Sequence, residues 1–142
     1  MKDYMQVAIE EAQKSGSDIP VGAIVVKNGE IIAKAHNTRE KDNDITSHAE
    51  ILAIRIAEKK LNNWRLDDCE LYVTLEPCPM CGWAILQSRI SKVYFGSFDT
   101  NYGAFSKLKL NSYSNSNLKI FSGISEDKCN DLLNKFFKNI RK

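Results

Sequence analysis

Two short segments of the chain carry residues that could hold a metal ion. One is His48-Ala49-Glu50, and the other is Pro77-Cys78-Pro79-Met80-Cys81. Each is a weak signal alone, because His-x-Glu occurs by chance and a single Cys-x-x-Cys is also typical of a redox pair or of two buried small residues. Together they supply one histidine and two thiolates, which are ligand types that zinc prefers. The two segments therefore predict a zinc site.

The two cysteines are spaced for binding one metal. Cys78 and Cys81 are three residues apart at the predicted start of a helix, which places both sulfur atoms on one side of it and favours thiolates. Three protein ligands with a fourth position open are typical of a catalytic zinc. His36 is the alternative histidine. We expect Cys69 and Cys129 to be ordinary core residues, because neither has a paired ligand nearby in the sequence.

Glu50 is the candidate for proton transfer. Residues two apart on a helix do not face each other, so we expect Glu50 to leave the metal to His48 and to approach a metal-bound water from the side. Two thiolates cancel the charge of Zn²⁺, and such a zinc acidifies its water less than one held by histidines. A carboxylate that passes the proton of this water to a leaving nitrogen would compensate. A zinc-activated water with such a proton shuttle is suited to the hydrolytic removal of an amine. The alternative interpretation of Glu50 is a solvated charge on the surface of the helix.

The elements that must position these residues follow from the hydrophobic pattern. Helices are expected over 3–14, 48–57 (capped by Thr46 or Ser47), 79–86 and from about residue 125. Strands are expected over 21–26, 31–35, 71–75, 93–95 and 118–121, with Asn28-Gly29 as a hairpin turn. This order predicts a single α/β domain over residues 1–142, with three α/β/α layers around a mixed five-stranded sheet.

Three further segments have a less certain structure. Residues 37–46 are polar and are expected to form a loop, and residues 96–117 form an irregular stretch that is long enough to be functional. The terminal helix has an apolar stripe, in which Phe136 and Phe137 are expected to belong to the core. The members of that stripe are Cys129, Leu132, Leu133, Phe136, Phe137 and Ile140, and the opposite face carries Lys128, Lys135, Lys138 and Arg141.

Composition restricts the class of protein and its partners. The chain has 142 residues, 43 % of them hydrophobic and 27 % charged, and it contains no apolar run long enough to cross a membrane. The first ten residues include two acids and do not resemble a signal peptide, so we expect a cytoplasmic protein. Residues 1–86 hold 10 basic and 14 acidic side chains, and residues 87–142 hold 10 and 4. The basic second part favours a polyanionic partner, although a solvated helix face also carries charge.

These motifs resemble the zinc-dependent cytidine deaminase superfamily, whose signature is H-x-E followed by P-C-x-x-C. Within it the chain is similar to the TadA-type branch, which acts on adenosine in tRNA. The run Val-Thr-Leu-Glu-Pro-Cys-Pro-Met-Cys at 73–81 and the Phe-Phe of the terminal helix select this branch. The similar segments are 19–23, 35–37, 47–51, 71–81, 88–90, 93–96 and 132–137.

The resemblance implies a cytidine-deaminase-like fold and hydrolytic deamination of the wobble adenosine in a tRNA anticodon stem-loop. It implies one Zn²⁺ per subunit, a homodimer and a set of site residues. These are His48, Cys78 and Cys81 as zinc ligands, Glu50 as the proton shuttle, and Asn37, the backbone at Ala49, and Asp99 as substrate contacts. By themselves, Asn37 would be a turn residue and Asp99 a loop acid.

The chain departs from the branch in two places. Gly82-Trp83-Ala84 stands where Ala-Gly-Ala is common, and residues 100–107 are bulkier than usual in a region that frames substrate. Two alternatives therefore stay open. One is a deaminase of a free base or nucleoside such as guanine, cytosine or cytidine. The other is a zinc-stabilised RNA-binding module without enzymatic activity.

Overall fold

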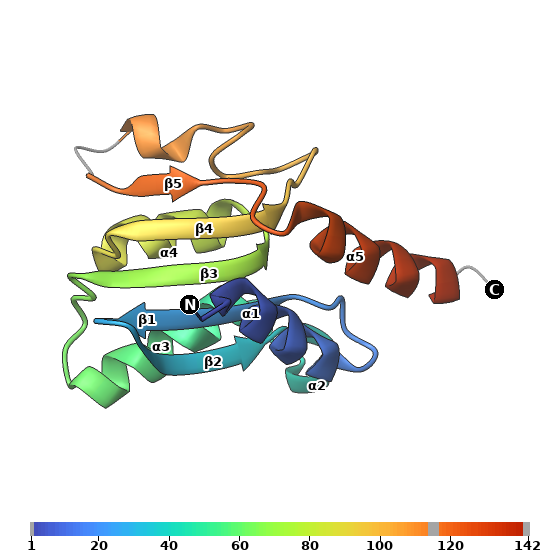
Figure 1. Ribbon diagram of the computed structural model, residues 1–142, viewed down its shortest axis with the longest axis horizontal. Coiled ribbons are helices and arrows are strands. Elements are labelled where there is room, and N and C mark those ends of the chain that lie inside the picture. The colour runs from blue at the N-terminus through green and yellow to red at the C-terminus, as the bar shows by residue number, and fades with distance from the viewer. Residues whose placement is uncertain (1, 114–116, 141–142) are drawn as a thin grey trace.

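A mixed sheet forms the middle layer of the molecule (Figure 1). The computed structural model describes residues 2–113 and 117–140, and within them five strands lie in the order β2-β1-β3-β4-β5. β1 pairs antiparallel with β2 and β3, whereas β3, β4 and β5 are parallel. The strands are β1 (Gly22–Lys27), β2 (Glu30–His36), β3 (Cys69–Leu75), β4 (Lys92–Ser97) and β5 (Lys119–Phe121).

Helices cover both faces of the sheet, which confirms the predicted three-layer α/β/α class. In Figure 1, α1 and α5 lie in front of the sheet, while α3 and α4 lie behind it. Two groups of buried side chains correspond to the two faces, one packed around α3 and α4 and the other around α1. The helices are α1 (Tyr4–Ala12), α2 (Arg39–Asp42), α3 (Ala49–Leu61), α4 (Pro79–Ser88) and α5 (Glu126–Ile140), with short 3₁₀ turns η1 (Gln13–Ser15) and η2 (Leu110–Tyr113).

The predicted hairpin between β1 and β2 is confirmed. Asn28 and Gly29 have φ angles of 51° and 77°. Two successive positive φ values are what a two-residue type I′ turn requires, and Asn-Gly is the pair that adopts them at least cost. The turn places Lys27 opposite Glu30 and so sets the register of the first strand pair.

Two local predictions were wrong. Residues 37–46 are not a plain loop, because they include the short helix α2. The buried carboxylate of Asp18 holds α2 by accepting hydrogen bonds from the backbone N–H groups of Glu40 (2.7 Å) and Lys41 (3.3 Å). The residue that caps α3 is His48, and neither Thr46 nor Ser47 takes that position. The Thr46 hydroxyl instead donates to the Asp44 carboxylate at 2.8 Å.

The terminal helix packs less than its apolar stripe predicts. Cys129 is buried, as is Cys69, so both cysteines are core residues as expected. Beyond its first turns α5 extends past the sheet (Figure 1), and Phe137 is 40 % and Ile140 63 % exposed. Phe136 is only partly buried, so the placement of both phenylalanines in the core was wrong. Arg141, predicted for the opposite face, and residues 114–116 of the predicted irregular stretch lie outside the described residues.

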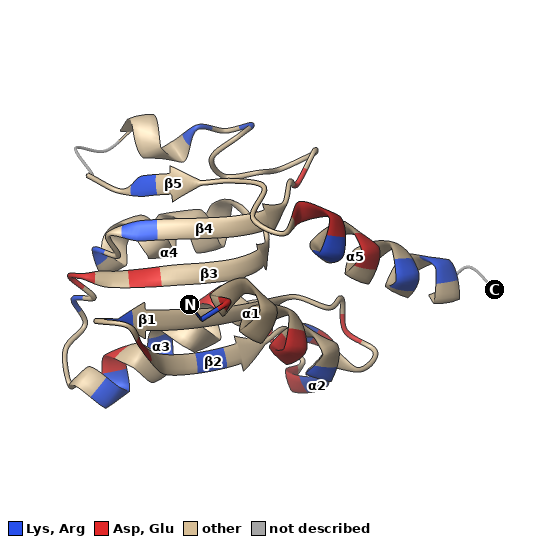
Figure 2. Cartoon of the chain, in the orientation of Figure 1, with Lys and Arg blue, Asp and Glu red and all other residues tan. Residues whose placement is uncertain are grey.

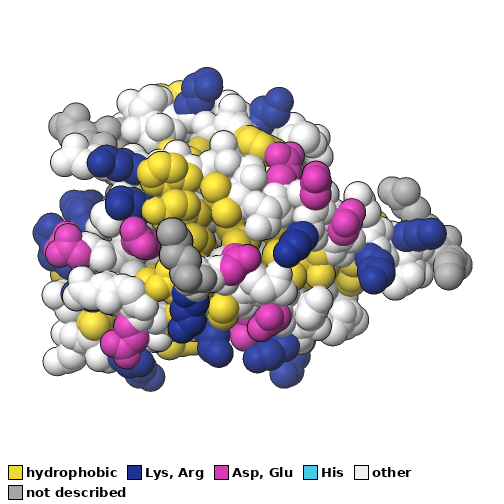
Figure 3. All heavy atoms as spheres, in the orientation of Figure 1, with side chains coloured by type: hydrophobic (Ala, Val, Ile, Leu, Met, Phe, Trp, Pro, Cys, Tyr) yellow, Lys and Arg dark blue, Asp and Glu magenta, His cyan; other side chains and the backbone are white. Residues whose placement is uncertain are grey.

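A row of aromatic rings crosses the front face of the sheet. Tyr72, Tyr94 and Phe121 are register neighbours on β3, β4 and β5, and their rings stack with centroids 4.3 and 4.7 Å apart. Figure 3 shows apolar side chains gathered on this face over β4 and β5. No helix among the described residues is long and apolar enough to cross a membrane.

Candidate active site

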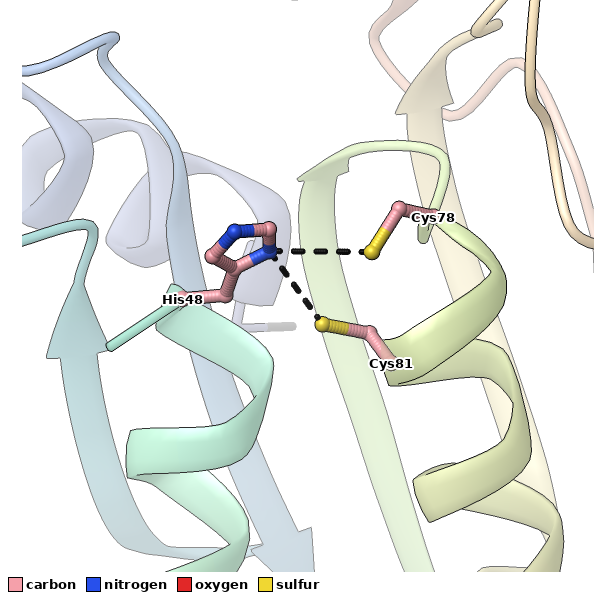
Figure 4. Close-up of side chains that lie close together, drawn as sticks. All are labelled: His48, Cys78 and Cys81. Carbon is pink, nitrogen blue, oxygen red and sulfur yellow. Dashed lines mark hydrogen bonds between the residues drawn. The ribbon is translucent and has the colours of Figure 1, made fainter. Parts of the chain in front are cut away.

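The three predicted metal ligands come together at the edge of the sheet where the parallel strands end (Figure 4). His48 directly precedes α3, while Cys78 caps the start of α4 and Cys81 lies in its first turn. Figure 4 shows the imidazole from one helix facing both sulfur atoms from the other. His48 Nδ1 lies 3.6 Å from Cys78 Sγ and 3.5 Å from Cys81 Sγ.

These distances fit zinc. A tetrahedral ion with bonds of about 2.0 Å to nitrogen and about 2.3 Å to sulfur places the two ligand atoms about 3.5 Å apart. The His48, Cys78 and Cys81 ligand atoms all lie within 4.8 Å of one another. Among the described residues neither Cys69 nor Glu50 belongs to this cluster, and His36 pairs with Glu11 instead at 3.1 Å. The three side chains therefore form a donor set for one zinc ion, with no fourth ligand in the part of the chain that the structure describes.

The two thiols differ electrostatically. Hydrogen bonds from the Cys81 thiol and from His48 lower the pKa of Cys78 to about 4. The pKa of Cys81 is raised, because its proton is held by Cys78 and because its side chain is buried. The metal-free site therefore favours a thiolate at Cys78, and a bound dication favours deprotonation of the second thiol.

Glu50 is not a surface charge. It lies in the first turn of α3, only 4 % exposed. Burial is the main cause that raises the pKa of its carboxyl to about 7, and the charge of Cys78 raises it further. A carboxyl group whose pKa lies near neutral pH is suited to accept a proton and to return it.

A pocket of about 150 Å³ opens beside the ligand cluster. The substrate residues predicted from the resemblance, Asn37, Ala49 and Asp99, all lie on its wall together with Glu50. The lining residues are Ile19, Val21, Asn37, Arg39, His48, Ala49, Glu50, Leu75, Glu76, Cys78 and Asp99.

Asn37 and Asp99 also hold their own loops. Asn37 donates from Nδ2 to the Ile19 carbonyl at 3.1 Å and accepts at Oδ1 from the Arg39 N–H at 3.2 Å, which leaves one amide proton and one lone pair. Asp99 Oδ1 accepts from the N–H groups of Asn101 (3.0 Å) and Tyr102 (2.9 Å). Each residue therefore has the structural role that its sequence position indicates, and each also lines the pocket.

Sequence reasoning missed Asp18, Arg39 and Glu76. Asp18 fixes α2 and thereby places Arg39 at the pocket. Glu76 is 1 % exposed and belongs to the run at 73–81, in which the two cysteines are the more evident functional residues. A carboxylate inside a strand-to-helix connection that is otherwise apolar was the one available signal, because such a group must find hydrogen-bond donors when it is buried.

Comparison with known proteins identifies the family. Residues 1–97 match the model of the cytidine and deoxycytidylate deaminase zinc-binding region. The chain belongs to this family. It is 45 % identical to a tRNA-specific adenosine deaminase from Bacillus subtilis (strain 168), covering 98 % of this chain and 89 % of the relative. It is 43 % identical to a tRNA-specific adenosine deaminase from Aquifex aeolicus (strain VF5), covering 97 % of this chain and 94 % of the relative.

A solved structure shares the fold of this family member closely. The structure comes from work on A-to-I editing by tRNA:A34 deaminases at the wobble position of transfer RNA. It is 38 % identical to this chain, with a TM-score of 0.88, and the match covers 92 % of this chain and 98 % of that one. The match confirms the predicted cytidine-deaminase-like fold.

Proposed function

We propose that this family member deaminates adenosine to inosine at the wobble position of a tRNA anticodon. The observation that carries the proposal is the buried carboxyl of Glu50, which lines a pocket beside the His48, Cys78 and Cys81 donor set. A zinc ion that only stabilised an RNA-binding module would need no such pocket. It would also need no neighbouring carboxyl group with a pKa near neutral pH.

In this reaction water displaces the amino group at C6 of adenine, which leaves as ammonia. His48, Cys78 and Cys81 would hold a zinc ion, which would supply Lewis-acid activation of the attacking water. The Glu50 carboxylate accepts a proton from this water and delivers it to the departing amino nitrogen. Oxygen is thereby bonded to C6, the C–N bond breaks, and adenosine and water become inosine and ammonia. Asn37, the Ala49 backbone and Asp99 line the wall against which the base is held.

Several observations favour an adenosine in tRNA over a free base. The relatives that cover nearly the whole chain are named for activity on tRNA. The second part of the chain is basic, which suits a phosphate backbone. An anticodon loop holds its bases unpaired, so that turning one into a pocket costs little. With tRNA as substrate, we place the protein in the cytoplasm.

One assay tests the proposal against its alternatives. The zinc-loaded protein is incubated with a tRNA that has an anticodon adenosine and, in parallel, with free adenosine, cytidine, cytosine and guanine, and the products are separated by chromatography. We expect inosine in the tRNA alone. Deamination of free substrates alone would identify a nucleoside or base deaminase. A protein that binds zinc and tRNA but makes no product would be a binding module.

We also propose that the protein is a homodimer that uses the outer surface of α3 and α4. Ile56 on α3 and Trp83 on α4 are 43 % and 39 % exposed, although both are large and apolar. Side chains of this kind are typical of the centre of an interface. Light scattering on the protein as it elutes from a size-exclusion column should give twice the mass of one chain. The Trp83→Asp variant should have the mass of a single chain. A wild-type protein of single-chain mass at micromolar concentration would contradict the proposal.

A further inference from the structure

Glu76 is a buried carboxylate at which several hydrogen-bond donors converge. It follows β3 directly, two residues before the zinc ligand Cys78. Oε1 accepts from the Asp99 N–H (3.1 Å) and the Ser106 hydroxyl (2.7 Å). Oε2 accepts from the N–H groups of Phe105 (3.2 Å) and Ser106 (2.7 Å). Among the described residues no lysine or arginine pairs with this carboxylate, so loop donors satisfy it without a counter-ion.

All these donors belong to one segment, residues 99–106, which bends around the carboxylate. The closest approach is at Gly103, where a Cβ would lie 2.6 Å from Glu76 Cδ and 2.7 Å from Oε2. Real Cβ atoms do not come that close, so a side chain at position 103 would displace the Glu76 carboxylate from its place among these donors. The Ala104 N–H also donates to the Pro77 carbonyl at 2.9 Å, which fixes the loop to the same connection.

The loop and the connection meet at the pocket. Asp99 and Glu76 both line it, and Asp99 begins the segment that Glu76 holds. We infer that Glu76 is a positioning residue for substrate binding, whose carboxylate shapes the loop 99–106 and so places Asp99 on the pocket wall, where it contacts the substrate. The inference rests on the proposed function, because it assigns this loop to the binding of the anticodon.

A change of one atom tests the role. In Glu76→Gln an NH2 group replaces one carboxylate oxygen. In place of Oε1 it faces the Asp99 N–H, while the Ser106 hydroxyl can turn to accept from it. In place of Oε2 it faces the N–H groups of Phe105 and Ser106, so in either orientation at least one backbone donor loses its acceptor. Unsatisfied buried donors are costly, so the loop should loosen while the zinc ligands keep their places. We expect the KM for an anticodon stem-loop RNA to rise about tenfold. We expect kcat per bound zinc to change by less than about threefold.

Two serines provide a weaker variant and a matched control. Ser106→Ala removes one of the bonds to Glu76 and should raise KM in the same direction but less, and the double variant Glu76→Gln/Ser106→Ala should show less than the product of the two effects. Ser88→Ala removes a buried hydroxyl that donates to the Ile85 carbonyl (2.8 Å) at the far end of α4. It should leave KM unchanged. Hydrogen exchange should become faster over residues 99–106 in Glu76→Gln and stay unchanged over α3.

The outcomes separate the loop from the activity. A Glu76→Gln protein with wild-type KM and wild-type exchange over 99–106 would overturn the inference. So would a fall in kcat per bound zinc with unchanged KM, which indicates a role in the chemical step and not in substrate binding. If Glu76→Gln does not fold, unchanged KM in Ser106→Ala decides against the inference. A wild-type protein that makes no inosine would contradict the proposed function, while the exchange measurement still tests whether Glu76 holds the loop.

Discussion

At the scale of single residues, the site places a carboxyl group where charge is costly. Burial favours the neutral form of Glu50, whose pKa rises from an ordinary value of 4.5 to about 7. A group with a raised carboxyl pKa binds its proton more tightly in the folded state than in the unfolded state. In the metal-free protein the buried carboxyl group therefore costs no folding free energy below pH 4.5. Above that pH the cost in stability grows until the pH exceeds 7, where the carboxyl group is ionised.

This sign predicts that Glu50→Gln stabilises the metal-free protein at pH 8 by up to about 3 kcal/mol and changes it little at pH 4.5. Urea unfolding at the two pH values measures the difference. Glu30→Gln, on an exposed side chain, is the control and should be flat with pH. The same Glu50→Gln variant should bind zinc and make no inosine. A variant less stable than wild type at pH 8 would show that Glu50 contributes to stability as a carboxylate.

The cysteines give a second prediction at this scale. Cys78→Ser removes one of three ligands and should lower zinc content well below one ion per chain, as measured by atomic emission after dialysis. Cys69→Ala should keep one zinc ion, because Cys69 is buried and lies outside the ligand cluster. Loss of zinc in Cys69→Ala would indicate a closed structural site with three sulfur ligands.

The ligand set could be predicted from sequence because residue type and spacing determine it. The roles of Asp18 and Glu76 could not be predicted. Each of them accepts hydrogen bonds from backbone N–H groups about 22 to 30 residues away. Every residue type except proline has such a group, so the sequence does not show which of them will lie near a given carboxylate.

At the scale of elements, most strands and helices could be predicted to within a few residues, because each has the period of its own structure. α5 shows the limit of this method. Its apolar stripe predicts one buried face, but the pattern does not say how far the neighbouring sheet extends. Only the start of α5 meets β4, where Cys129 is buried.

The contact between α5 and β4 depends on Gly96. A Cβ there would lie 2.8 Å from Cys129 Cβ and 2.9 Å from the Thr74 carbonyl oxygen, and still closer to Cys129 Sγ. Gly96→Ala should therefore lower the free energy of unfolding by about 1–3 kcal/mol, as measured in urea. The loss should be smaller in a Cys129→Ala background, where Sγ is gone. Equal losses in both backgrounds would show that the sulfur atom does not limit the approach.

At the scale of the whole molecule, charge is concentrated on a projecting element. In Figure 2 acidic residues colour the start of α5, and basic residues colour the part toward its end. A hollow of about 660 Å³ lies between α1 and α5, and Lys128, Lys135 and Lys138 line it. α5 extends past the same edge of the sheet at which β3 and β4 end beside the active site (Figure 1).

The lysines of this hollow should contribute to tRNA affinity. Replacing Lys128, Lys135 and Lys138 together by Gln should weaken binding and reduce the slope of log affinity against log salt by about 2. Fluorescence anisotropy of a labelled anticodon stem-loop over a salt series measures this. Lys59→Gln/Lys60→Gln, at the far end of α3, removes two lysines away from the hollow and should change the slope less. Equal slopes in wild type and triple variant would exclude α5 from the RNA contact.

The positions of the two tryptophans determine what the intrinsic fluorescence of the protein can report. Trp64 is 57 % exposed with Arg65 over its ring, and Trp83 is 39 % exposed on α4. Both indoles meet water in a single folded chain, so in a monomer their emission should change little when the core unfolds. The stacked tyrosines of the sheet lose their fixed geometry on unfolding, and their near-ultraviolet circular dichroism should follow that transition. Tryptophan emission should instead follow events at the surface, such as a partner chain covering Trp83.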